Sequence, residues 1–271
     1  MKKRLAASVL ALGLAAAAAV WAGRAPRFAH ALPDYPMVDL TGVVARAEAG
    51  KADYALLLAQ TGLGPAAVDA LLEAGRGGEL ADFQARYFAP CGWKTVKGAA
   101  VVRLEVTEGD FEFAPLEKGD ILLTPSSRCG GWRNGHAALV VDAQEGLVLE
   151  AYSLGCPSRL SPLSTWQDKA AVAVLRLKGA SEARRARMAD WARENLAGLP
   201  YGLFSGLPWL GESAGPPATQ CAHLVWCACA AFGYDVGGAG GWPVTPRDIS
   251  LSPLLETVQV WGLPQGRRWP S

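Results

Sequence analysis

The stretch HAALVVDAQEGLVLEAY, residues 136–152, decides the fold class of this chain. Its apolar run at 137–141 leads into a turn at 142–146, and the chain then returns through a second apolar run at 147–152. Two short apolar runs around such a turn predict a β-hairpin whose first residue is His136. The same patterns of apolar residues predict further strands at residues 101–106, 121–124, 172–177 and 257–261.

Helices follow the strands in the second half of the chain. Ser181 has the side chain of a helix N-cap and precedes Glu182, so we expect a helix from there to about Leu196. Residues 221–232 are strongly apolar and predict a buried helix that begins at Cys221. Strands followed by helices indicate an α+β domain, with a mainly antiparallel sheet packed on the cysteine-bearing helix.

The first 31 residues look like an export signal. Lys2, Lys3 and Arg4 precede an uncharged run at 5–23, and Ala29-His30-Ala31 fits a small-x-small cleavage site. The competing interpretation is an uncleaved N-terminal anchor, because the apolar run approaches the ~20 residues that a membrane span needs. In either case we expect the protein to be secreted or held in the cell envelope.

Residues 32–98 are expected to form a tether, at 32–42, and a small helical unit. Helical spacing of apolar residues runs from 52 to 87, with a break at Gly62 and Gly64 and an end at 75–78. Nothing in this unit suggests chemistry. The main domain is then residues 99–271.

Composition and charge narrow the function classes. Hydrophobic residues make up 51% of the chain, which is enough for a full-sized core. Residues 1–31 hold five basic and no acidic side chains, so the remainder has 21 basic and 25 acidic side chains, a net charge of −4. Nucleic acid is therefore not an expected partner, because phosphate binding needs a basic surface.

The six cysteines do not form a metal-binding pattern. Cys129 and Cys156 flank one predicted strand pair and are the first candidates for a disulfide in an exported protein. There is no CxxC pair, and His223 with Cys227 at i, i+4 supplies fewer ligands than a structural zinc site needs. No metal and no other cofactor is expected.

Cys221 is the candidate nucleophile. A thiol at the start of a helix meets unpaired backbone N–H groups and the positive end of the helix dipole, which favour the thiolate and can hold a developing oxyanion. Cys227 and Cys229 lie deeper in the same segment and are expected to be inert core residues. Cys221 taken alone would be interpreted as a structural residue by default, so its assignment as a nucleophile depends on a nearby base.

His136 is the expected base. At the start of a strand its ring can lie at the rim of the sheet and face a helix N-terminus, as an activated thiol requires. Glu150 could orient that ring if the hairpin register puts both residues on one face, which the sequence leaves open. The alternatives are a turn histidine and a solvated glutamate. His223 is a rival base, but two residues along a helix from Cys221 it should point away from the thiol.

Together these motifs resemble the YiiX/YebB-like cysteine hydrolases, in the permuted papain-like branch of the NlpC-type superfamily. The resemblance implies a histidine strand that precedes the cysteine helix, with Cys221 as nucleophile, His136 as base and Glu150 as the orienting residue. Family members also tend to carry a Pro-Tyr pair, which implies that Tyr201 lines the substrate pocket; the alternative is that Tyr201 is a buried structural aromatic residue. The resemblance covers residues 116–235 and rests on Gly119-Asp120-Ile121-Leu122, His136, Glu150-Ala151, Pro200-Tyr201 and Cys221 with Leu224-Val225-Trp226.

One departure from the family concerns the residues after the nucleophile. Many relatives have Cys-Ser-Glu, whereas this chain has Cys221-Ala222-His223. That pattern is closer to the lecithin:retinol acyltransferase-like branch, whose members act on acyl lipids. The same branch uses a second histidine near the position of Glu150, and this chain lacks it. The departure bears on the substrate class more than on the reaction type.

The sequence therefore predicts an exported thiol hydrolase that cleaves an amide bond, in cell-wall peptide by family analogy, through an acyl-thioester intermediate. The alternative of similar mechanism is a lipid deacylase or acyltransferase. The alternative of another class is a non-catalytic envelope binding module. The expected partner is a small peptide, cell-wall or acyl-lipid substrate, with membrane contact only if the N-terminal segment is uncleaved.

Overall fold

The computed structural model describes residues 13, 30–97, 101–109, 111–129, 133–203, 205, 216–237 and 244–270. The predicted export segment at 1–31 lies outside these residues except for Gly13, His30 and Ala31. The signal peptide or anchor therefore stays a prediction. Among the described residues, no helix is long and apolar enough to cross a membrane.

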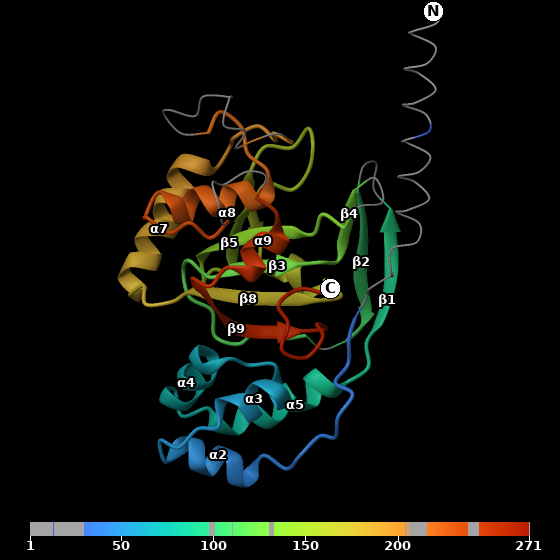
Figure 1. Cartoon of the computed structure of the whole chain (residues 1–271), viewed down its shortest axis with the longest axis vertical. Coiled ribbons are helices and arrows are strands. Elements are labelled where there is room, and N and C mark those ends of the chain that lie inside the picture. The colour runs from blue at the N-terminus through green and yellow to red at the C-terminus, as the bar shows by residue number, and fades with distance from the viewer. Residues whose placement is uncertain are drawn as a thin grey trace, which may run out of the picture.

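A six-stranded antiparallel sheet forms the centre of the molecule (Figure 1). Its strands lie in the order β7-β6-β5-β3-β8-β9. Their bounds are Ile121–Thr124 (β3), His136–Asp142 (β5), Leu147–Glu150 (β6), Arg159–Pro162 (β7), Val172–Leu177 (β8) and Leu255–Trp261 (β9). The strand that begins at His136 is thus an interior strand, paired with β3 on one side and β6 on the other.

A second antiparallel sheet crosses one end of the first. It consists of Gly92–Lys97 (β1), Val101–Glu108 (β2) and Ser127–Cys129 (β4), in the order β1-β2-β4. In β2, Leu104 N donates to the Ser126 carbonyl and Val106 N to the Asp168 carbonyl, both at 2.8 Å. These bonds hold the small sheet beside the point where β5 begins.

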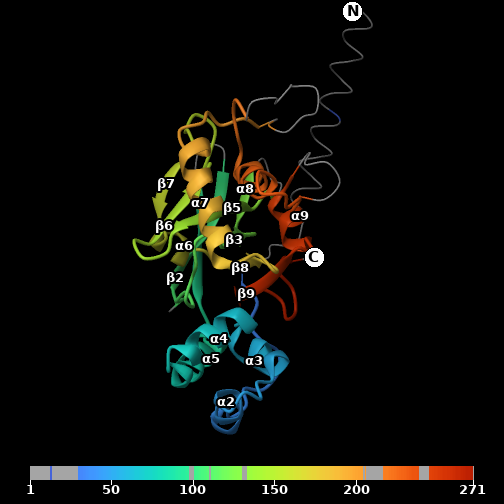
Figure 2. The same ribbon diagram turned by 90° about the vertical axis from the view of Figure 1, so that its left-hand side faces the viewer.

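Helices cover both faces of the main sheet (Figures 1 and 2). On one face lie Glu182–Leu196 (α7), Cys221–Ala230 (α8) and Pro246–Leu251 (α9). The other face and the β9 edge meet the helical unit, which comprises Thr41–Glu48 (α2), Tyr54–Thr61 (α3), Pro65–Glu73 (α4), the 3-10 turn Gly77–Glu79 (η1) and Leu80–Phe88 (α5). The short helix Ser164–Gln167 (α6) adds Trp166 to this second core.

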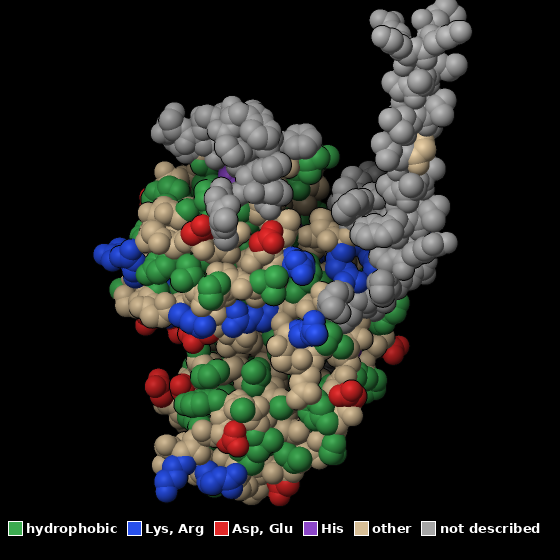
Figure 3. Space-filling view, viewed as in Figure 1, with side chains coloured by type: hydrophobic (Ala, Val, Ile, Leu, Met, Phe, Trp, Pro, Cys, Tyr) green, Lys and Arg blue, Asp and Glu red, His purple; other side chains and the backbone are tan. Residues whose placement is uncertain are grey.

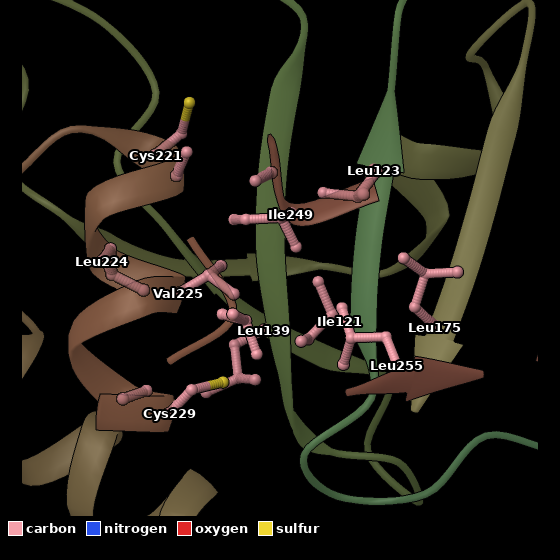
Figure 4. Packing of buried hydrophobic residues seen from close by; sticks show 14 of the residues in the cluster. Ile121, Leu123, Leu139, Leu175, Cys221, Leu224, Val225, Cys229, Ile249 and Leu255 are labelled. Carbon is pink, nitrogen blue, oxygen red and sulfur yellow. The ribbon is translucent and has the colours of Figure 1, made fainter. Parts of the chain in front are cut away.

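Alternate residues of the central strands divide the core in two. In β5, Leu139 packs toward α7 and α8, whereas Val140 packs toward the helical unit. Because the strand is covered on both faces, its sequence is a continuous run of apolar residues and does not alternate between apolar and polar residues. Figure 4 shows the α8 side, where Val225 lies beside Leu139.

The loop between α3 and α4 covers the outer edge of β9. The Gly62 carbonyl accepts a hydrogen bond from Val260 N at 2.7 Å, and Gly64 N donates to the Val258 carbonyl at 2.8 Å. Gly62 has a φ of +72°, and a β-carbon on either glycine would collide with the β9 backbone. The glycine break in the sequence therefore lets the loop approach an edge strand closely enough to pair with it.

The α+β class with antiparallel sheets is confirmed. β3 and β8 have the expected bounds, and β9 begins two residues earlier than expected. Several elements were not expected from the sequence. They are α2, which begins within the last residues of the expected tether, and the short elements β1, β4, β7, α6 and α9. Only Val43 and Ala47 are buried in α2, and β1 is mostly exposed, so neither element carries a strong apolar pattern.

Replacing Gly64 with alanine should destabilise the fold, because the added methyl group would collide with the Thr257 carbonyl oxygen of β9. We expect a loss of about 1–3 kcal/mol in the free energy of unfolding, measured by urea denaturation followed by circular dichroism. Gly78→Ala is the matched control, since a β-carbon there meets no heavy atom within 4 Å. Equal midpoints for the two variants would contradict the pairing of this loop with β9.

Candidate active site

Cys221 is the first residue of α8. Gln220 is the N-cap residue, and its Oε1 accepts a hydrogen bond from Ala222 N at 2.9 Å. The other end of the same amide, Nε2, donates to the Val244 carbonyl at 2.9 Å. Gln220 therefore ties the start of α8 to the loop that leads into α9. In Figure 4 the Cys221 sulfur points away from the packed side chains of the core.

The chain just before Cys221 is held by the segment around Tyr201. Thr219 N donates to the Pro200 carbonyl and Gly202 N donates to the Thr219 carbonyl, each at 2.9 Å. These bonds form a short parallel bridge between Tyr201 and Thr219. Tyr201 consequently lies in the wall of the same cavity as Cys221.

His136 lies at the rim of the main sheet, where β5 begins. The preceding residue, Gly135, has a φ of +65°. A β-carbon on Gly135 would collide with the ring of Trp269 and lie 2.8 Å from the Thr124 carbonyl oxygen. Only glycine fits such a turn without strain. The turn leaves His136 just 6% exposed, in the wall of the cavity.

The hairpin register places Glu150 on the same face as His136. β5 and β6 pair Leu139 with Leu149 and Val140 with Val148, and this register continued puts Glu150 opposite Ala138. Glu150 is therefore a diagonal neighbour of His136 on one face, within reach of its side chain. His136 Nε2 and Glu150 Oε2 are 2.7 Å apart, and both residues are buried.

Two aromatic rings hold the imidazole in place. Trp166, fully buried, stacks on His136 with the ring centroids 5.4 Å apart and an interplanar angle of 19°. Tyr152 approaches edge-on, with a centroid distance of 5.6 Å. Between them these rings restrict the imidazole to an orientation that keeps Nε2 on Glu150.

The surroundings of His136 favour its protonated form. Burial lowers the pKa of His136, but hydrogen bonds with the Cys221 thiol and the Glu150 carboxylate outweigh burial and raise the pKa to about 9. Burial raises the pKa of Glu150, whereas hydrogen bonds from His136 and Ser161 and the charge of His136 lower it to about 2. At neutral pH the pair is therefore an imidazolium and a carboxylate. Since Nε2 is bonded to Glu150, Nδ1 is the ring nitrogen left for the thiol.

Cys221 and His136 open into one cavity of about 420 Å³. Tyr201 and Gln220 also line it. Leu154 and Leu203 lie in its wall as well, and each is 57% exposed. The volume is in the range of small-molecule binding sites, enough for a substrate of a few residues.

His223 lies elsewhere in the helix packing. It is fully buried, and its Nδ1 is 3.2 Å from Thr219 Oγ1. Its Nε2 is 3.5 Å from the Cys227 sulfur, and its ring stacks on Trp226. The rival base is thus placed with Cys227 and does not line the cavity of Cys221.

The disulfide expectation is not met. Cys156 is a free thiol, so a bridge between Cys129 and Cys156 is absent. Cys91, Cys221, Cys227 and Cys229 are not bonded in disulfides either. Within the described part of the chain, no group of three or more His, Cys, Asp or Glu side chains could hold a metal ion.

Three residues of the site were not identified from the sequence. A sequence pattern could have identified Gln220, because a polar residue directly before an apolar helix is a candidate N-cap. No local sequence pattern marks Trp166 or Lys169. They lie about 30 residues after His136. The packing of α6 against the sheet brings Trp166 onto the His136 ring, and Lys169, just after α6, lines the cavity.

No protein-family model matches the chain, and no curated protein sequence matches it. Among solved structures, it is similar to the crystal structure of the metalloprotein yiiX from Escherichia coli O157:H7, with a TM-score of 0.41 and 19% sequence identity. The match covers 54% of this chain and 99% of that one. A likeness of this size does not establish a family, so membership of the permuted papain-like branch stays a prediction.

The Glu150→Gln variant should have a lower His136 pKa than the wild type. The amide removes the carboxylate that raises this pKa, while burial, which lowers it, remains. NMR titration of the imidazole signals measures the change, and Glu145→Gln in the exposed turn of the same hairpin is the control. Identical His136 titrations in the wild type and Glu150→Gln would contradict the coupling.

Stability should follow the same coupling. The folded pKa of His136, about 9, lies above its ordinary value of 6.5, so its contribution is full below pH 6.5 and is lost as the pH rises through 9. The Glu150 contribution is full above pH 4.5 and is lost as the pH falls through about 2. The wild-type free energy of unfolding should therefore decline between pH 6.5 and 9, with a smaller decline in Glu150→Gln.

Proposed function

We propose that this protein is an exported thiol hydrolase that cleaves an amide bond, with Cys221 as nucleophile, His136 as base and Glu150 as the residue that orients His136. The observation that carries the proposal is the 2.7 Å bond between His136 and Glu150, together with a cavity that both His136 and Cys221 line. A thiol, an imidazole and an orienting carboxylate are the three parts that a cysteine hydrolase needs.

The reaction proceeds in two halves. The Cys221 thiolate attacks the substrate carbonyl carbon, and the His136 imidazolium gives its proton to the leaving amine as the C–N bond breaks. The acyl group then remains on sulfur as a thioester. His136, now neutral, takes a proton from a water molecule that attacks the thioester carbonyl. The acid departs, and the proton on His136 restores the ion pair with the thiolate.

The N-terminus of α8 supplies the oxyanion stabilisation. Gln220 Oε1 already accepts the Ala222 N–H, so the Cys221 N–H is the backbone donor beside the thiol. A backbone donor fixed before the reaction stabilises the negative oxygen of the tetrahedral intermediate without reorganisation. Gln220 acts here as a positioning residue, because its amide fixes the first turn of the helix.

The fold superfamily and the substrate form part of the same proposal. We place the chain in the permuted papain-like branch of the NlpC-type superfamily, on the order of the histidine strand and the cysteine helix. Cell-wall peptide in the cell envelope is the proposed substrate, by the resemblance and by the export pattern at residues 1–31. Tyr201 lines the substrate pocket in this assignment.

A lipid deacylase or acyltransferase is the second candidate. Leu154 and Leu203 are exposed apolar side chains in the cavity wall, and an acyl chain could cover them. The Cys221-Ala222-His223 pattern favours the same function. Faster hydrolysis of a medium-chain acyl ester than of a peptide amide by the purified protein would select this candidate.

Labelling with limiting iodoacetamide, followed by mass mapping, tests the nucleophile. Cys221 should react before Cys156, which is partly exposed, and before the buried Cys227. His136→Ala should slow the labelling of Cys221 by about tenfold or more, because the ion pair is lost. Labelling of Cys221 no faster than Cys227 would leave a non-catalytic binding module as the better description.

Turnover of a cell-wall peptide preparation tests the roles. Cys221→Ala and His136→Ala should each abolish activity with unchanged circular dichroism, and Glu150→Gln should retain a small fraction because the base is present but poorly oriented. His223→Ala is the control and should keep activity. Activity retained in His136→Ala and lost in His223→Ala would transfer the base role to His223.

A further inference from the structure

The cavity that holds Cys221 has a wall of positive charge. Four basic residues line it: Arg103, Arg133, Lys169 and Arg247. Among the described residues, no aspartate or glutamate lines it. Residues 32–271 carry a net charge of −4, and on the face drawn in Figure 3 basic and acidic side chains occur in separate small groups. The concentration of basic residues in the cavity is therefore not a consequence of overall composition.

Lys169 is the basic residue whose position is hardest to explain without a ligand. It is only 8% exposed, and a backbone bridge to Glu105 fixes it against β2. Within the described part of the chain, its ammonium has no partner at hydrogen-bond or ion-pair distance. Burial lowers the pKa of Lys169, and the charge of Arg103 adds to that, while Glu105 and Glu150 oppose it at longer range. Because Lys169 lines the cavity, an anion bound there can pair with its ammonium directly, which offsets the cost of a charge on a largely buried side chain.

Ser127 presents a second unpaired polar atom in the same wall. Its Oγ is buried and has no hydrogen-bond partner among the residues that the structure describes. Ser127 lies opposite Arg103 in the pairing of β2 with β4, so the hydroxyl and the guanidinium are cross-strand neighbours. The Ser127 carbonyl also accepts a hydrogen bond from Gly135 N at 3.2 Å, directly before His136. Ser127 is thus hydrogen-bonded to the turn that precedes His136.

We infer that Lys169, Arg103 and Ser127 form a subsite for a carboxylate that the substrate carries close to its scissile carbonyl, so that the preferred substrate is an acidic peptide. The inference rests on the proposed function and specifies its substrate class. The carboxylate pairs with the Lys169 ammonium, and Ser127 Oγ, which is enclosed in the free protein, donates a hydrogen bond to it once the side chain rotates about χ1. Both contacts lie beside His136, so they position the acyl group for attack by Cys221.

The charges favour a monoanion over a phosphate. Arg103 Nε already contacts Glu105 Oε1 at 3.2 Å, which offsets part of its charge. The Glu150 carboxylate lies close enough to act on Lys169 and would repel a dianion more strongly than a single carboxylate. One unpaired ammonium therefore matches one negative charge.

Anion binding to the full chain tests the subsite without requiring any reaction at Cys221. In an NMR titration glutarate should bind saturably, and glutaramide, its neutral analogue, should bind about tenfold more weakly or not at all. Lys169→Met should weaken glutarate binding by about tenfold, and Lys169→Arg should restore it in part. Lys51→Met, which removes an exposed charge in the helical unit, is the control and should bind like the wild type.

Equal binding of glutarate and glutaramide, or unchanged glutarate binding in Lys169→Met, would overturn the inference. Tighter binding of inorganic phosphate than of glutarate would overturn it as well.

Alkylation of Cys221 gives a second readout. Iodoacetate and iodoacetamide differ by one negative charge, so the ratio of their rates at the mapped Cys221 reports the local charge. Lys169→Met should lower the iodoacetate to iodoacetamide ratio by about fivefold or more, and Lys51→Met should leave it unchanged. If Cys221 is reactive but its iodoacetate to iodoacetamide ratio is the same in Lys169→Met as in the wild type, the subsite is overturned and the proposed hydrolase activity stands. Glutarate binding that depends on Lys169, with an unreactive Cys221, would support the subsite and overturn the hydrolase.

Discussion

The buried hydrogen bond between His136 Nε2 and Glu150 Oε2 is the interaction on which the candidate site depends. Burial alone would leave the imidazole neutral, and burial alone would also disfavour an ionised Glu150. Paired, each group keeps the other charged, so the ring holds its proton and keeps Nδ1 directed to the thiol. The Gly135 turn and the Trp166 stack act on the same ring, and their effect is to keep this one bond in place.

The thiol reaches this pair from a different layer of the fold. β5 is an interior strand, and α8 packs against one face of the sheet that contains it. The two elements also begin at the same rim, so the first residue of each can line a common cavity. Gln220 fixes the start of α8, since its side-chain amide is hydrogen-bonded both to Ala222 N in the first turn of the helix and to the Val244 carbonyl. The arrangement requires rigid packing, and the apolar contacts of Leu139 with the α8 side of the core supply it.

The cavity combines features that favour different parts of one ligand. Leu154 and Leu203 contribute exposed apolar surface to the cavity wall, whereas Lys169, which is largely buried, contributes a positive charge. Apolar contacts supply affinity with little selectivity, and a buried charge strongly rejects ligands that leave it unpaired. We therefore expect Leu154 and Leu203 to affect mainly the affinity for a substrate, and Lys169 to affect mainly which substrate is accepted.

Features that depend on neighbouring residues could be predicted from the sequence. It predicted the strands at 121–124 and 172–177, the Ser181 cap, and the positions of His136 and Cys221 at the starts of their elements, because apolar runs, turns and caps act over a few residues. The position of Glu150 on the same face as His136 required the three-dimensional structure, because a shift of one residue in the β5–β6 register would put Glu150 on the opposite face. The same holds for Trp166 and Lys169, and for the placement of His223 beside Cys227 and outside the cavity. These contacts join distant parts of the chain, and the packing of whole elements, not local propensity, fixes them.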